Sequence, residues 1–369
     1  LTLKLVCELI NWNPNLRLYI VDDCTPPEYR ARFGVFHALS MASRRVTILR
    51  TPENRKKAGA INYALAAIAA SPTAFPDVIV TLDDDVRIAP TTIRNLVTEL
   101  LASPQLGAVC SQCRVLNKSK NLLTRLQGLV YVSFNATRLA DEGFYRGPLV
   151  MHGMLSAFRA EALYALGGFA EHHLIEDYEI TARLKKAGWH VKAALSALAW
   201  TKAPETFGEL WRQRTRWLYG GITIVAKPWY WPAVIQDLIG PGLFLSMLAV
   251  VGISFLGSRG AVPPLIPAVI IAFSGAQSLA WYGFNLWLMR FYPERDRTDW
   301  LIRTTLVPEF LYANLLTVIL VGAYLFHLFN IFSTRVPSAF VPGQRVIAVI
   351  GRAFRQFGYT QSWGTRVSG

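Results

Sequence analysis

Three long stretches without a formally charged residue dominate the second half of this 369-residue chain. They are Leu238–Gly257, Ala261–Met289 and Phe310–Phe332. Each is long enough to cross the roughly 30 Å hydrocarbon core of a bilayer as a helix. Only 17% of the chain is charged, against about 25% in soluble domains, and 52% is hydrophobic. We therefore expect three transmembrane helices within residues 233–334.

Residues 1–205 alternate between apolar segments typical of strands and amphipathic segments typical of helices. This alternation predicts an α/β domain with a mostly parallel sheet. Because neither a methionine nor a signal peptide opens the chain, we expect an earlier segment to precede Leu1. The expected strands are 16–21, 46–49, 78–81 and 106–115, and the expected helices are 29–42, 58–70, 90–101 and 122–139.

The net charge of +14 predicts contact with anionic membrane headgroups. No nucleic-acid motif accompanies the charge, so nucleic acid is not an expected partner. A basic loop from Arg290 to Arg303 separates the last two apolar stretches and predicts a cytoplasmic face there. With three spans the domain at 1–205 is then cytoplasmic too, which agrees with four cysteines that we expect to be reduced. The basic tail at 335–369 would face outward, against the positive-inside tendency.

Two of the expected strands end in carboxylates. Asp22-Asp23 follows the first strand, and Asp83–Asp85 follows the apolar run VIVTL. We expect both groups at one edge of the sheet, where α/β proteins place ligands. Adjacent carboxylates stay ionised together most easily beside a cation, and oxygen ligands favour Mg²⁺ or Mn²⁺. A solvated acidic turn is the alternative for either group.

Two further polar groups follow in order along the chain. Glu176-Asp177 opens an expected helix, where acidic residues also favour the helix dipole without any catalytic role. A capping box at Thr206 predicts a second helix that carries Gln213, Arg216 and Trp217 on one face. Because the aromatic run at 229–231 follows, we expect residues 206–232 to form an interfacial helix, and lipid anchoring is the alternative role for its Arg and Trp.

This order resembles the processive family-2 glycosyltransferases, the membrane synthases of cellulose, chitin, hyaluronan and poly-N-acetylglucosamine. Their signature is D, DxD, ED and QxxRW before transmembrane helices. Gln213–Trp217 reads QRTRW, Asp83–Asp85 fits DxD, and 57–62 reads KAGAIN, similar to the K-A-x-A-L-N segment of the family. The chain departs from the pattern at Ile175, where Thr is common, and at His152, where a small residue or Cys is common.

The resemblance implies a GT-A-type cytosolic catalytic domain followed by a helical transmembrane region in the cell (inner or plasma) membrane. It implies a multi-pass enzyme that transfers sugar from a UDP-sugar to a growing polysaccharide with inversion, and exports the polymer, with accessory export subunits as further partners. The implied metal is Mg²⁺ or Mn²⁺. By residue, the resemblance implies Asp177 as the base with Glu176 beside it, Asp85 on the metal, Asp22, Asp23, Lys57, Asp83 and Arg216 on the nucleotide sugar, and Gln213, Trp217 and Gly153 on the acceptor.

Two other functions stay open from the sequence. One is a non-processive membrane glycosyltransferase that adds a single sugar to a lipid acceptor. The other is a membrane receptor or transporter with a nucleotide-binding domain, although transporters tend to place ionisable residues inside their spans. The predicted spans hold almost none beyond His327.

Overall fold

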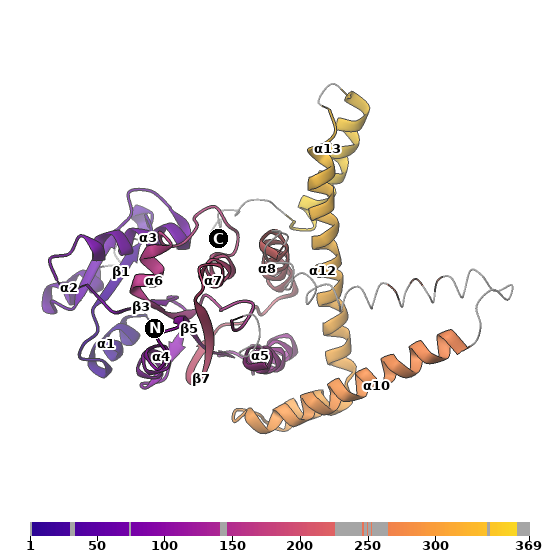
Figure 1. The fold of residues 1–369 in the computed structure, drawn as a ribbon, viewed down its shortest axis with the longest axis horizontal. Coiled ribbons are helices and arrows are strands. Elements are labelled where there is room, and N and C mark those ends of the chain that lie inside the picture. The colour runs from indigo at the N-terminus through magenta and orange to yellow at the C-terminus, as the bar shows by residue number, and fades with distance from the viewer. Residues whose placement is uncertain are drawn as a thin grey trace. The chain divides into compact units, whose positions relative to one another are not determined.

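The computed structural model describes residues 2–29, 34–73, 75–140, 146–225, 265–337 and 340–359, together with positions 246, 249 and 252. The chain divides into two compact units, Leu1–Ala203 and Pro204–Gly369 (Figure 1). We describe each unit by itself.

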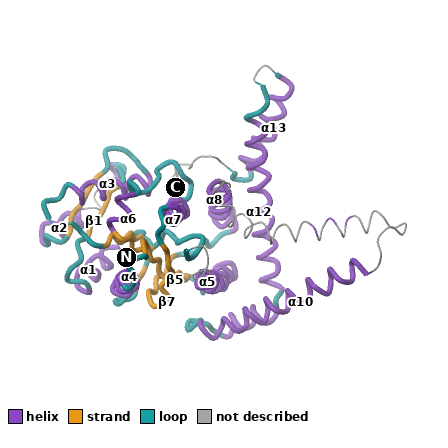
Figure 2. The backbone as a smooth tube through the Cα atoms, in the orientation of Figure 1, coloured by secondary structure: helices purple, strands orange, loops and turns teal. Residues whose placement is uncertain are grey.

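The first unit alternates helices and strands, as the sequence predicts, and Figure 2 shows its strands gathered among helices. The expected strands and helices are all present with small shifts at their ends. The elements are α1 (Thr2–Trp12), β1 (Leu18–Asp22), α2 (Gly34–Ala42), β2 (Val46–Arg50), α3 (Lys56–Ala69), β3 (Val78–Leu82), β4 (Arg87–Ile88), α4 (Thr92–Leu101), β5 (Leu106–Val115), α5 (Leu122–Ala140), β6 (Leu155–Arg159), α6 (Ala160–Ala165), α7 (Glu176–Lys186) and β7 (His190–Thr201).

The strands form a parallel two-stranded sheet and a five-stranded sheet of mixed direction, so the prediction of one mostly parallel sheet is wrong. β1 and β2 pair in parallel, and a five-stranded sheet has the order β3-β6-β5-β7-β4. In that sheet β5 and β7 are parallel, but β6 runs antiparallel to both β3 and β5. The expectation that Asp22-Asp23 and Asp83–Asp85 lie on one sheet edge is also wrong, because β1 and β3 belong to different sheets.

The reversed direction of β6 places a loop beside the acidic end of β3. Leu155, the first residue of β6, lies opposite Leu82, the last residue of β3. The Asp83 amide then donates to the Met154 carbonyl at 3.0 Å. As a result the segment 151–154 and the carboxylates after β3 meet at one end of the sheet.

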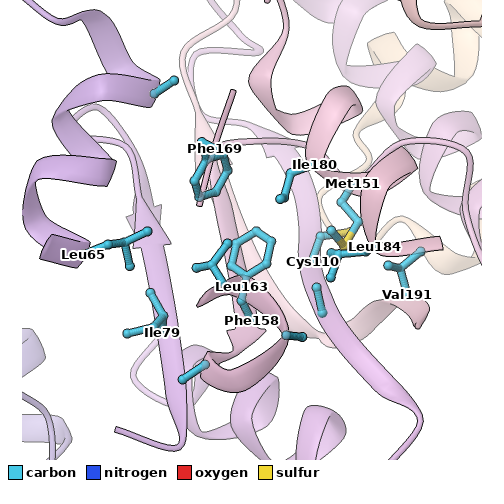
Figure 3. Close-up of a cluster of buried hydrophobic side chains, with 14 of the residues drawn as sticks. Leu65, Ile79, Cys110, Met151, Phe158, Leu163, Phe169, Ile180, Leu184 and Val191 are labelled. Atoms are coloured by element: carbon cyan, nitrogen blue, oxygen red, sulfur yellow. The ribbon is translucent and has the colours of Figure 1, made fainter. Parts of the chain in front are cut away.

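The core under this end is apolar and closely packed (Figure 3). Ile79 of β3, Phe158 of β6 and Ile180 of α7 are all buried in it. The Phe158 and Phe169 rings meet edge to face with centroids 5.5 Å apart. Burial of each such side chain stabilises the fold by about 1.5–3 kcal/mol. The polar groups at this end of the sheet are therefore supported by a well-packed core.

Helix α7 starts and stops where its charges favour it. Ile175 caps it in an extended conformation, and Glu176, Asp177 and Glu179 occupy the first turn, next to the positive end of the helix dipole. The basic residues of its last turn complement the opposite end. Gly188, with a φ of +98°, takes the left-handed turn just beyond the helix.

The second unit is helical. Its described elements are α8 (Phe207–Val225), α10 (Leu265–Leu288), the 3₁₀ turn η4 (Met289–Phe291), α11 (Arg297–Thr305), α12 (Val307–Ser333) and α13 (Val341–Gln356). The predicted capping box is present, since the Glu209 amide donates to Thr206 Oγ1 and the Thr206 amide to Glu209 Oε2, both at 3.3 Å. Helix α8 packs on α12, where Tyr219 accepts a hydrogen bond from Asn330.

One described helix, α12, is long and apolar enough to cross a membrane, with a mean hydropathy of 2.1. The predicted span at 238–257 lies outside the described residues apart from three isolated positions, as do the aromatic residues at 229–231. The stretch at 261–289 contains α10. The arrangement of three spans therefore stays a prediction.

Candidate active site

Lys57 is the centre of a polar cluster in the first unit. Its ammonium, on the first turn of α3, lies 2.7 Å from Asp83 Oδ1 and 2.9 Å from Glu176 Oε1. It also donates to the Gly153 carbonyl at 2.8 Å. An ammonium has three donors, and here all three have an oxygen partner. The cluster therefore joins β3, α7 and the loop before β6 through one side chain.

Gly153 links this lysine to Asp177. The Gly153 amide donates to Asp177 Oδ2 at 2.7 Å, and the Tyr178 amide donates to Asp177 Oδ1 at the same distance. A Cβ at position 153 would lie 2.9 Å from Lys57 Nζ and 3.1 Å from Asp177 Oδ2. Any larger residue would therefore force Lys57 or Asp177 to shift from its position in the cluster.

The electrostatics of the cluster favour a carboxyl that can exchange a proton near neutral pH. Burial, reinforced by the neighbouring Glu176 carboxylate and opposed by Lys57, raises the pKa of Asp177 to about 7. Burial alone would lower the pKa of Lys57, but the Asp83 and Glu176 carboxylates outweigh it and raise that pKa above its usual range. Lys57 therefore stays protonated near neutral pH, whereas the Asp177 carboxyl beside it can gain or lose its proton there.

A pocket opens onto this cluster. Polar groups of Lys57, Glu176 and Asp177 line it together with Thr81, Gly153 and Ser156. Its remaining lining is apolar and comes from Ile61, Met151, Phe158, Phe169 and Ile180. The Asp177 carboxyl thus borders a small cavity that polar and apolar side chains line together.

The carboxylates after β3 fit a hard divalent metal that is shared with a phosphate ligand. Asp85 is exposed, and its charge acts on Asp83, whose Oδ1 is held by Lys57. The described residues contain no group of three or more His, Cys, Asp or Glu side chains that could enclose a metal by themselves. Mg²⁺ typically binds one or two carboxylates and completes its shell with water and substrate phosphates, so this donor set fits it.

Asp22 and Asp23 shape the loop that leads into α3. Asp22 is buried, and its Oδ2 accepts from Arg50 at 2.8 Å. Asp23 Oδ1 accepts from Thr51 Oγ1 at 2.9 Å and from the Arg55 amide at 2.8 Å. These bonds bring the chain to the start of α3, two residues before Lys57. A direct contact of Asp22 or Asp23 with a nucleotide stays a prediction.

Gln213, Arg216 and Trp217 lie on α8 and so belong to the second unit. Gln213 Oε1 is buried and has no hydrogen-bond partner among the described residues. The guanidinium of Arg214 lies 4.4 Å from the centre of the Trp217 ring, in the range of a cation–π contact. The Trp217 indole is thus in contact with a side chain of its own helix, α8.

A family model described as "Glycosyl transferase family group 2" matches residues 78–330, which include β3, the Asp83–Asp85 cluster, α7 and α8. The chain belongs to this family. The predicted resemblance is therefore confirmed, and the glycosyltransferase assignment rests on most of the chain.

Curated relatives agree with the assignment to family group 2. The chain is 32% identical over 151 residues to the probable glycosyltransferase YdaM of Bacillus subtilis, covering 41% of this chain and 36% of the relative. It is 27% identical over 178 residues to the poly-beta-1,6-N-acetyl-D-glucosamine synthase of Staphylococcus aureus strain COL, covering 48% and 42%. The chain thus matches less than half the length of either relative.

A solved structure supports the fold of this family-group-2 chain. The mannosyltransferase PcManGT from Pyrobaculum calidifontis, in complex with GDP-Man and Mn2+, superposes with a TM-score of 0.52 at 20% identity. The alignment covers 78% of this chain and 80% of that one. The predicted GT-A-like α/β fold is confirmed.

The motifs did not predict two features of this family-group-2 chain, which are the contacts of Glu171 and the burial of Arg214. Arg55 pairs with Glu171 at 2.8 Å, and the Asn62 amide group bonds both Glu171 and the Phe169 backbone. In the sequence, the one indication that Asn62 matters is its place in the KAGAIN segment at 57–62. Arg214 is buried. It lies four residues after the buried Leu210, on the same face of α8, so helical spacing could have predicted its burial.

Proposed function

We propose that this chain transfers a sugar from a UDP-sugar to an acceptor hydroxyl with inversion at the anomeric carbon. The observation that carries the proposal is Asp177, a carboxyl with a raised pKa that lines a cavity together with a fixed cation, Lys57. A base with a pKa near the working pH suits the removal of a hydroxyl proton.

In the proposed step Asp177 accepts the proton of the acceptor hydroxyl. The acceptor oxygen forms a bond to the anomeric carbon, and the bond from that carbon to the diphosphate oxygen breaks with its electron pair. One displacement needs one base and no covalent sugar–enzyme intermediate, so the configuration inverts. Glu176 is a positioning residue here, because its carboxylate holds Lys57 and raises the pKa of Asp177.

The leaving diphosphate requires positive charge. Lys57 supplies part of it, and Arg216 is the second candidate, since a guanidinium suits bidentate phosphate contacts. Asp85 would hold Mg²⁺ or Mn²⁺, which neutralises diphosphate charge when bound, and Asp83, two residues earlier, would contact the nucleotide sugar. Asp83 keeps Lys57 in place through its 2.7 Å contact.

We further propose that the product is a polysaccharide that is exported across the cell membrane as it grows. The similarity to the Staphylococcus aureus poly-beta-1,6-N-acetyl-D-glucosamine synthase supports this, as does the apolar helix α12. Trp217 and Gln213 would contact the acceptor sugar, with the catalytic domain in the cytoplasm of a multi-pass protein and accessory subunits aiding export.

The test is release of UDP by the purified chain with Mn²⁺ and UDP-N-acetylglucosamine, UDP-glucose or UDP-glucuronate, followed by sizing of the labelled product. Asp177→Asn should lower transfer by about 10²–10⁴-fold while donor binding persists. Asp77→Asn, the same change at an exposed residue just before β3, is the matched control. A single lipid-linked sugar in place of a ladder would favour the non-processive alternative, and absence of UDP release would refute the transferase proposal.

A further inference from the structure

Strand β5 extends beyond its pairing with β6. The pairing ends with Cys110 opposite Ser156, whereas β5 continues to Val115. β6 begins at Leu155, and the chain before it leads to the candidate site. Buried backbone groups need hydrogen-bond partners, so the part of β5 after Cys110 must find partners other than β6 on this side.

Two side chains supply these partners. Asn135 of α5 meets both backbone groups of Cys113, since its Oδ1 accepts from the amide at 3.3 Å and its Nδ2 donates to the carbonyl at 2.8 Å. The His152 ring bonds the Ser111 carbonyl through Nε2. Because a carbonyl oxygen can only accept, the ring carries a proton on Nε2. His152 thus joins β5 to the segment that precedes β6.

The segment 151–154 carries hydrogen bonds that organise the candidate site. Gly153, next to His152, donates to Asp177 Oδ2 at 2.7 Å and accepts from Lys57 at 2.8 Å. The sequence of the segment is Met-His-Gly-Met, so His152 has its one side chain that can donate a hydrogen bond. This side chain therefore provides the segment with its side-chain anchor on β5.

His152 acts as a hydrogen-bond donor and not as a charge. Burial, reinforced by the positive charges of Arg138 on α5 and Lys57 on α3, lowers the pKa of the His152 imidazole to about 3. The ring is therefore neutral throughout the pH range in which Asp177 titrates. Its own protonation does not contribute to a pH profile measured near pH 7.

Several groups on other elements face the Asp177 carboxyl. Burial and the Glu176 carboxylate raise its pKa, whereas Lys57 and the backbone amides of Tyr178 and Gly153 oppose the rise. The Cys110 thiol on β5 is also near, and burial raises its pKa, so it stays neutral. The Gly153 amide favours the ionised carboxylate, because it donates to that form. Loss of this bond would raise the pKa of Asp177 further.

We propose that His152 is a positioning residue, which anchors the 151–154 segment to β5 and thereby keeps the Gly153 amide on the Asp177 carboxylate. The ring acts through Gly153 and does not touch the reacting atoms. A small residue or Cys, which is common at this position in the family pattern, lacks the ring that bridges to β5. The anchor is thus a feature of this chain where it departs from the pattern.

Hydrogen–deuterium exchange of the Gly153 amide in the full chain tests the anchor without any reaction. His152→Leu keeps the approximate size of the side chain but removes the donor, and we expect about tenfold faster exchange at Gly153. His152→Gln supplies an amide donor in place of the ring and should exchange nearly as the unaltered chain does. Asn135→Leu is the matched control, because it removes the other side-chain partner of β5 and should leave Gly153 exchange unchanged.

The pH profile of kcat/KM tests the link to Asp177, and this readout rests on the proposed function. In His152→Leu we expect the midpoint to rise by about one pH unit, which lowers kcat/KM about tenfold below pH 7. His152→Gln should restore the midpoint, and Asn135→Leu should not move it.

The two measurements separate failure of the proposed function from failure of this inference. A profile of the unaltered chain without a midpoint near pH 7 would remove Asp177 as the base, while faster Gly153 exchange in His152→Leu would still support the anchor. Unchanged Gly153 exchange in His152→Leu, or equal acceleration in Asn135→Leu, would overturn the inference. Faster exchange with an unshifted midpoint would also overturn it, because Gly153 would then not act on Asp177.

Discussion

Gly153 sets the spacing between the lysine and the carboxyl of the candidate site. Gly153→Ala would place a methyl 2.9 Å from Lys57 Nζ and 3.1 Å from Asp177 Oδ2, so at least one of them must move. We expect transfer to fall about 100-fold, the usual effect of a 1 Å misplacement, with a stability cost of about 1–3 kcal/mol.

The measurement is the initial rate of UDP release together with a thermal unfolding curve. Gly34→Ala is the control, since a Cβ there meets nothing within 4 Å. A Gly153→Ala enzyme with the activity of the Gly34→Ala enzyme would show that this spacing is unimportant.

The pH dependence of kcat/KM follows from the pKa of Asp177. Because burial raises that pKa to about 7, the carboxyl is protonated and inactive as a base below it, and ionised above it. We expect kcat/KM to rise tenfold per pH unit well below pH 7 and to level off above it. A profile that is flat from mildly acidic to mildly basic pH would remove Asp177 from the role of base.

At the residue scale, the motif order was enough to select Lys57, Asp83, Glu176 and Asp177, which the structure brings into one cluster. The contact that organises them was not predictable from spacing. Lys57 and Gly153 are 96 positions apart, and their hydrogen bond exists only because β6 returns next to β3. The ion pair of Asp22 with Arg50 likewise depends on the parallel pairing of β1 and β2.

Helix α3 is tied to the loop before α7 through Asn62. Its Nδ2 donates to the Phe169 carbonyl at 2.8 Å, and its Oδ1 accepts from the Phe169 amide at 2.8 Å. Asn62→Asp keeps the shape but removes the donor and faces Glu171 with a second carboxylate. We expect a loss of about 1–3 kcal/mol, seen as a lower thermal unfolding midpoint.

Asn95→Asp is the control for the stability loss of Asn62→Asp. Asn95 also links two elements, through a 2.7 Å bond to the Ser196 carbonyl, but in an exposed position where water can replace it. The loss of stability in Asn95→Asp should be clearly smaller than in Asn62→Asp. Equal losses for the two variants would mean that the Asn62 contacts do not hold α3 in place.

At the element scale, apolar patterns located β1, β2, β3 and β5 of the first unit, but they predicted neither β4, β6 and β7 nor the direction of the strands. Parallel and antiparallel strands with both faces covered have the same apolar pattern, so β6 gave no sign of its reversal. The capping residues were more informative. The capping box at Thr206 predicted the start of α8, because a helix start of this kind depends on local chemistry alone.

At the scale of the whole molecule, α12 is the described helix whose composition suits a bilayer. Val318 lies near its middle and is exposed. Val318→Arg would place a charge in hydrocarbon at a cost of roughly 2.5–3.5 kcal/mol. We expect less of the variant to stay with membranes after alkaline extraction. Leu195→Arg, an exposed apolar position on β7, is the control, and equal extraction of both would argue against a span at α12.

The hydrogen bond between Trp211 and the Phe357 carbonyl joins residues that are 146 positions apart in the second unit. The Tyr359 hydroxyl fixes the same end of α13 to the Ile319 carbonyl of α12. Unfolding of α13 would therefore remove contacts from α8 and from α12 at once. The helix that carries the QRTRW motif is thus held in part by a segment that follows it by more than a hundred residues.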